Sequence, residues 1–264
     1  MHNTRINVDP DFAEWAKLPS GCDGGNVAGA VWVCGYEWGR TEHPNDLDFG
    51  HQIAELKKGF PERPPAETER IVQNSDRRCV FDQRAFKLIS VITTNRPLQG
   101  LKEVKSYART HITYSARSEF FKLNLFPISF KNIKESNWRR GWANKTGLPT
   151  KKAYQDWCRE HRYPEIAKWF IKGSPTLVIF TYEASMRDFF KIFGGSEIAD
   201  WNAEWVEHRN LYWKLAKSGE TVVAVFPTYS PYAKNKQIGS AGLRIREICD
   251  AQLGRDWLPR ALQT

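Results

Sequence analysis

The sequence of 264 residues contains no apolar run long enough to cross a bilayer, and its first residues lack the basic start and apolar core of a signal peptide. We therefore expect a cytoplasmic protein without a membrane partner. Its five cysteines are scattered and form no C-x-x-C pair, which argues against a disulfide framework and a zinc site. Buried thiols, and no metal or other cofactor, are expected instead.

Internal repeats, low-complexity tracts and domain linkers are also missing, so we expect a single domain over residues 1–264. Nothing in the sequence indicates an obligate protein partner. The apolar residues, 41% of the chain with 13% aromatic residues, are ample for a packed core and argue against disorder. The 39 Lys and Arg exceed the 30 Asp and Glu by a net charge of +9. This excess favours a polyanionic partner, such as nucleic acid or an anionic membrane surface, over an acidic protein.

The positive charge is concentrated between residues 131 and 172, where eleven Lys and Arg stand against four acidic residues and give +7 of the net charge. Arg139 and Arg140 are candidate DNA contacts in this segment. Cations that follow phosphates, interleaved with flat rings that cover sugars or bases, suit a DNA surface. The alternative is that the tryptophans form the buried stripe of helices whose solvated faces are basic. These residues are Trp138, Trp142, Trp157 and Trp169.

Four short segments rich in β-branched or aromatic residues are predicted strands, and their nearly continuous apolar runs are typical of strands covered on both faces. Their ranges are 27–34, 120–126, 176–181 and 221–226. Long stretches with helical features separate them; Ser185 and Ser240 are predicted helix caps. We predict an α/β fold with a central four-stranded parallel sheet flanked by helices and a basic, tryptophan-rich helical insert at residues 131–172.

In such sheets ligands bind beyond the carboxyl ends of the strands, and three segments leave the predicted strands at that edge: "GYEWG", "NLFPISF" and "FPTYSPYAKNK". Together they resemble the motifs of the uracil-DNA glycosylase superfamily. The turn from Gly35 to Gly39 is similar to that family's G-x-D-P-Y turn, with Glu37 at the acidic position. Asn124 matches the base-reading Asn, and Ser230 with Pro231 matches part of the family's H-P-S-P loop. The resemblance extends over the whole α/β core.

The resemblance implies that Glu37 orients or activates the attacking water and that Asn124 hydrogen-bonds the edge of a flipped pyrimidine. An Asn that caps the strand end through its own backbone is the alternative for Asn124. The implied base-pocket residues are Gly35, Tyr36, Trp38, Gly39 and Phe49, whose aromatic members have core packing as their alternative. The implied DNA contacts of the last loop are Thr228, Tyr229, Ser230, Pro231, Tyr232, Lys234 and Lys236, with Tyr232 as a wedge and an ordinary exposed turn as the alternative.

The sequence departs from the family pattern in ways that bear on the substrate. Thr228 stands where several branches have the His that stabilises the departing base, Trp38 replaces the turn's proline, and Glu37 is longer than Asp. The cysteine pattern of an iron-sulfur cluster is absent. We therefore expect a roomier pocket for a bulky modified pyrimidine, such as glucosylated 5-hydroxymethylcytosine in phage DNA. Its excision would leave abasic sites as an antiviral defence.

Three other functions are consistent with parts of the sequence. A uracil or mismatch repair glycosylase would use the same motifs. A methyltransferase would use "GYEWG" as a cofactor turn, but the segment lacks a close run of glycines and no acidic residue ends the next strand. A DNA-binding module without catalysis would retain the basic surface but would not need Glu37.

Overall fold

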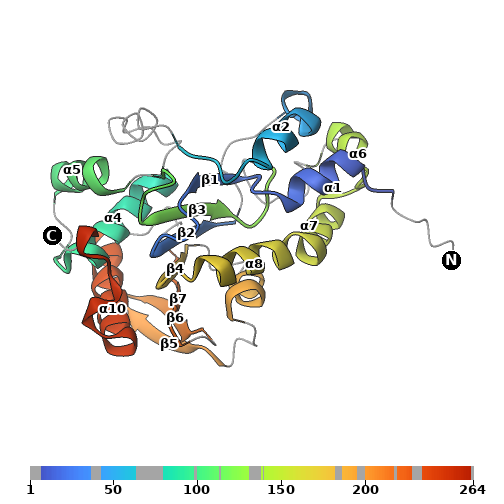
Figure 1. The fold of residues 1–264 in the computed structure, drawn as a ribbon. Helices are drawn as coiled ribbons and strands as arrows, with labels where there is room; N and C mark the ends of the chain where they lie inside the picture. Colours follow the sequence, from blue (N-terminus) through green and yellow to red (C-terminus); the bar gives the residue numbers. More distant parts are fainter. Residues whose placement is uncertain are drawn as a thin grey trace.

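The computed structural model describes residues 7–36, 43–63, 80–97, 100–112, 114–130, 138, 140–181, 186–194, 200–216, 219–227 and 234–262. These residues form three layers, with a central sheet between two groups of helices (Figure 1). No helix in the described ranges combines the length and apolar character needed to span a membrane.

The middle layer is a mixed sheet whose seven described strands have the order β1-β3-β2-β4-β7-β6-β5. The inner strands β3, β2, β4 and β7 are parallel, whereas β1 at one edge and the β5–β6 pair at the other run antiparallel to their neighbours. The bounds are β1 Cys22–Gly25, β2 Val31–Gly35, β3 Phe120–Asn124, β4 Leu177–Phe180, β5 Asn202–Val206, β6 Arg209–Leu215 and β7 Val222–Val225. The predicted α/β class is confirmed, but the sheet exceeds the four strands predicted.

The four predicted strands correspond to β2, β3, β4 and β7, each shorter than its apolar run. The first begins at Val31 instead of residue 27, because the Asn26 side chain accepts a hydrogen bond from Ala28 N at 3.0 Å and closes a turn. The glycine-rich β1 lacks any apolar run that could have predicted it. At Gly25, φ is +106° and the carbonyl of Phe120 lies against the Cα, so a side chain would collide there.

The first face of the sheet buries alternate strand residues, among them Trp32, Cys34, Leu123 and Phe180, under helices on the right of Figure 1. These helices are α1 (Pro10–Lys17), α2 (Phe49–Leu56), α6 (Arg140–Thr146), α7 (Lys151–His161), α8 (Tyr163–Gly173) and α9 (Met186–Phe189), which continues as a π-helical turn at Phe190–Gly194. A short 3-10 turn, Pro44–Asp46, precedes α2.

The second face buries the intervening residues, including Val31, Val33, Ile179 and Ala224. Its covering helices are α4 (Val80–Thr94), α5 (Leu101–His111), α10 (Asn235–Leu253) and the 3-10 turns Arg255–Trp257 and Arg260–Leu262. Because α10 begins at Asn235, Ser240 lies inside the helix, and its predicted capping role is wrong. Ser185 lies outside the described residues.

The predicted basic segment contributes α6, α7 and α8, which connect β3 to β4 across the first face. Trp142 is 1% exposed, and the other three tryptophans of the segment pack against the same core. Trp142 is thus a core residue and the other three are partly buried against the core, which is closer to the alternative than to a DNA-facing role. Two of the segment's cations, Lys151 and Arg162, are buried as well, so the exposed positive charge here is smaller than the sequence indicates.

Candidate functional site at the carboxyl edge of the sheet

The strand order indicates where a ligand is expected to bind. β2 pairs with β3 on one side and with β4 on the other, and β4 then pairs with β7. After β2, the chain therefore adds β3 on one side of it and later adds β4 and β7 on the other side. Parallel sheets with this order bind ligands outside the carboxyl ends at the point of reversal, between β2 and β4. Gly35 and Thr181 stand on the two sides of that point.

Gly35 and Asn124 are direct partners at the ends of β2 and β3. A Cβ at Gly35 would collide with Oδ1 of Asn124 and would lie 3.5 Å from the Phe81 ring of α4. The Asn124 side chain, in a residue that is 4% exposed, donates from Nδ2 to the Gly21 carbonyl at 3.1 Å. Glycine at position 35 thus makes room for the amide of Asn124. The structure brings these two predicted site residues together.

Thr181, which the sequence analysis did not single out, belongs to the same row. Phe180 is level with Cys34 in the register and both pack on the first face, so the next residues, Thr181 and Gly35, face the second. Thr181 is 1% exposed, and its hydroxyl has no hydrogen-bond partner among the described residues. A polar residue directly after a buried strand at this edge was the signal that could have identified it.

Arg162 holds the end of β3 from the first face. Its guanidinium is buried and donates to the Asn124 carbonyl at 3.2 Å and to the Leu125 carbonyl at 2.9 Å. It also bonds the carbonyls of Ala16, Leu18 and Ser20 and the Ser20 hydroxyl, at 2.6 to 3.2 Å. One side chain therefore ties the end of α1 and the approach to β1 to the backbone of the site.

Four charged side chains are buried on the second face. One of them, Lys122, precedes Asn124 on β3 and so lies further from the carboxyl edge of the sheet. Arg63 bonds Asp23 at 2.8 Å and approaches Asp82 at 3.4 Å. Lys122 contacts Asp23 and bonds Asp82 at 2.8 Å. We call these residues the buried quartet. Its two positive and two negative charges balance, which is the condition under which charges are tolerated in a core.

The quartet is linked to the site through Phe81, whose ring lies under the Lys122 ammonium at 4.8 Å and beside Gly35. Burial alone would raise the pKa of Asp23, but Lys122 and Arg63 outweigh it and lower that pKa. The quartet thus fastens α4, β1 and β3 together beneath Asn124.

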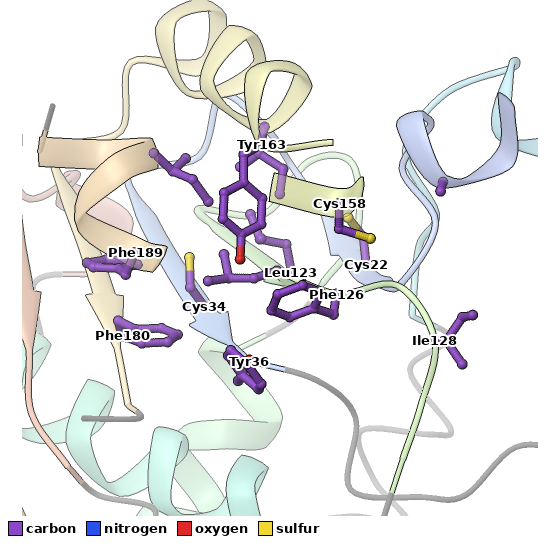
Figure 2. Packing of buried hydrophobic residues seen from close by; sticks show 14 of the residues in the cluster. Cys22, Cys34, Tyr36, Leu123, Phe126, Ile128, Cys158, Tyr163, Phe180 and Phe189 are labelled. Atoms are coloured by element: carbon purple, nitrogen blue, oxygen red, sulfur yellow. The ribbon is translucent and has the colours of Figure 1, made fainter. Parts of the chain in front are cut away.

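On the first face, Tyr36 continues from Gly35 and packs edge-on against Phe126 with ring centroids 4.7 Å apart (Figure 2). Its hydroxyl accepts a hydrogen bond from Gln155 at 3.1 Å. Nearby, Arg159 forms a two-pronged ion pair with Asp188, at 2.8 and 3.0 Å, which raises the pKa of the guanidinium. Tyr36 is therefore held at the strand exit by packing and by α7.

The remaining described site candidates have different surroundings. Phe49 is 4% exposed and packs against Phe12 and Trp15 of α1, with ring centroids 5.6 and 4.8 Å away. Lys234 and Lys236 are exposed at the start of α10, where Lys236 pairs with Glu207 at 3.0 Å. Outside the described residues lie Glu37, Trp38, Gly39, Arg139, Thr228, Tyr229, Ser230, Pro231 and Tyr232, together with the side chain of Arg140.

Among the described side chains, no group of three or more His, Cys, Asp or Glu is placed to hold a metal ion. Cys22, Cys34, Cys158 and Cys249 are buried thiols. Burial raises the pKa of Cys22 and of Cys158 to about 12, despite Arg162, so these two thiols stay protonated at neutral pH.

Compared with known proteins, the chain matches no protein-family model and no curated protein.

Proposed function

We propose that the protein is a DNA glycosylase that hydrolyses the N-glycosidic bond of a flipped, modified pyrimidine. The observation that carries the proposal is the contact between Gly35 and Asn124 on adjacent parallel strands at the carboxyl edge. An Asn amide both donates and accepts, so it can read a ring nitrogen and an exocyclic group of a pyrimidine. The acidic residue Glu37 follows two positions after Gly35 in the sequence.

In the proposed reaction, the nucleotide leaves the base stack and enters the crevice between β2 and β4. Water attacks C1′ of the deoxyribose while the C1′–N1 bond breaks and its electron pair passes to the base. Glu37 orients the water and takes its proton, and its negative charge stabilises the oxocarbenium-like sugar. Asn124 donates to the base as negative charge develops on it.

The proposed substrate is a bulky pyrimidine such as glucosylated 5-hydroxymethylcytosine, and the proposed role is defence against phage. Support for this choice comes from the departures of the sequence at Glu37, Trp38 and Thr228. Excision of uracil or a mismatched base is the other outcome that the same chemistry allows.

Replacing Glu37 by Gln tests the catalytic assignment. The Glu37→Gln variant is expected to lose base release by at least about 100-fold, because a positioned general base contributes about 10²- to 10⁴-fold. Its affinity for DNA and the salt dependence of that affinity should remain close to wild type. Unchanged base release would refute the role of Glu37. Tight DNA binding without base release by the wild type would indicate a binding module instead.

A further inference from the structure

Thr181 has an environment that the packing of the free protein does not explain. The hydroxyl is fully covered, yet it has no hydrogen-bond partner among the described residues. Most buried polar groups are hydrogen-bonded, and leaving one unpaired is costly. The other buried threonines among the described residues follow that rule; the hydroxyls of Thr93 and Thr146 donate to backbone carbonyls at 2.9 and 2.8 Å. At the opposite end of the sheet, the Thr221 hydroxyl donates to the Pro175 carbonyl at 2.5 Å.

The position of Thr181 indicates a function for its unpaired hydroxyl. It follows β4 directly and is level with Gly35, so it lies next to the point between β2 and β4 where the strand order reverses. Gly35 has no side chain, and Asn124 lies just beyond it on β3. On the other side of Thr181, β7 is still paired, with Phe226 N donating to the Phe180 carbonyl at 3.0 Å. Two buried polar side chains therefore flank a glycine at the proposed crevice.

We propose that the Thr181 hydroxyl is a second hydrogen-bonding group for the flipped nucleotide and contributes with Asn124 to selection of the base. This inference rests on the proposed glycosylase function. A hydroxyl supplies one donor and two acceptor positions, so it complements the amide of Asn124 at a polar base edge. A site that must hydrogen-bond its substrate rejects analogues lacking the partner, because the buried group would then stay unpaired. Both side chains are covered in the free protein, so nucleotide entry requires the crevice to open.

The test compares Thr181→Val, Thr181→Ser and the control Thr221→Val by single-turnover base release and by urea unfolding. Thr181→Val removes the hydroxyl and keeps the branched shape. It is expected to lower base release by about tenfold or more while leaving the unfolding midpoint unchanged or slightly higher. Thr181→Ser keeps the hydroxyl and should restore most of the activity. Thr221→Val breaks a satisfied bond far from the crevice, so it should lower the unfolding midpoint and leave base release unchanged.

The negative results of this experiment distinguish failure of the Thr181 inference from failure of the proposed function. If the wild type releases bases and Thr181→Val does so equally well, the inference on Thr181 is overturned and the proposed function stands. If Thr181→Val loses stability as Thr221→Val does, the hydroxyl has a structural role and the inference is also overturned. If the wild type releases no base from any DNA tested, the proposed function fails and this inference with it.

Discussion

At the scale of single residues, Gly35 controls the geometry of the site because its missing side chain leaves space for the amide of Asn124. Gly35→Ala should displace that amide and lower kcat/KM for base release by about 10- to 100-fold, since an error of about 1 Å can cost that much. Overpacking against Asn124 should also cost about 1–3 kcal/mol of stability.

Gly50→Ala is the matched control for Gly35→Ala. Its Cβ would be 3.7 Å from the nearest atoms, which belong to Asp11 and Asp48, so ordinary contact is all that is added. Base release should be unchanged, and stability should be equal or slightly higher because alanine favours a helix. Measuring both variants by base release and urea unfolding checks the assignment. Full activity of Gly35→Ala would contradict the proposed arrangement of the site.

Asp23 makes the stability of the protein depend on pH in a predictable direction. Its folded pKa is lowered, below the value of about 3.9 in an unfolded chain. The stabilisation is therefore present above about pH 4 and is lost as the pH falls through the folded pKa. Urea unfolding between about pH 6 and pH 3 should show a steeper loss for wild type than for Asp23→Asn. The exposed Asp256→Asn should follow the wild type, and parallel curves for Asp23→Asn and wild type would contradict the account.

At the scale of elements, Arg162 lies between α7 and α8 and links these helices to the backbone that carries the site. Arg162→Leu would remove the guanidinium donor from five backbone carbonyls, of which that of Leu18 keeps a bond from Ser20 N, and should cost about 3–5 kcal/mol. Lys168→Ala removes only a surface pair with Glu165 at 2.8 Å and should cost less than about 0.5 kcal/mol. Urea unfolding of the two variants measures the difference. Equal stabilities would show that the carbonyls find other partners.

The elements also differ in how far the sequence could predict them. Buried parallel strands have continuous apolar runs, so β2, β3, β4 and β7 were predicted in place. The β1 segment "CDGG" has no such run. β5 is an edge strand and β6 is its inner neighbour, and most positions of both are exposed or half-buried. β1 pairs with β3, which is distant in the sequence, whereas β5 and β6 pair with each other across a short turn. The tryptophans of residues 131–172 were harder to assign, because helical spacing suits both a core and a binding face.

The residues of the candidate site that could be predicted are those at the end of a predicted strand and within a recognisable motif. Asn124 was identified from its strand exit and from the family resemblance, and its partner Gly35 from the glycine turn. Thr181 lies at an equivalent exit but has no motif around it. The buried quartet was not predictable, because its members at positions 23, 63, 82 and 122 meet only when β1, β3, α4 and the segment after α2 that carries Arg63 assemble.

At the scale of the whole molecule, the net charge of +9 favours a polyanionic partner, but the described structure redistributes that charge. In the basic segment, Lys151 and Arg162 are buried, and Arg159 pairs with Asp188. Lys234 and Lys236 at the start of α10 are exposed, and Lys236 pairs with Glu207. The start of α10 and the exposed lysines of α7 and α8 therefore both remain candidate parts of the proposed DNA surface.

The most direct test of the central claim is base release from DNA of defined composition. The wild-type protein would be incubated with duplexes carrying glucosylated 5-hydroxymethylcytosine, unmodified cytosine or uracil, and abasic sites would be cleaved with alkali. We predict strand cleavage with the glucosylated base and none with unmodified cytosine. Cleavage only at uracil would contradict the defence role and leave a repair glycosylase. No cleavage of any duplex would contradict the glycosylase assignment itself.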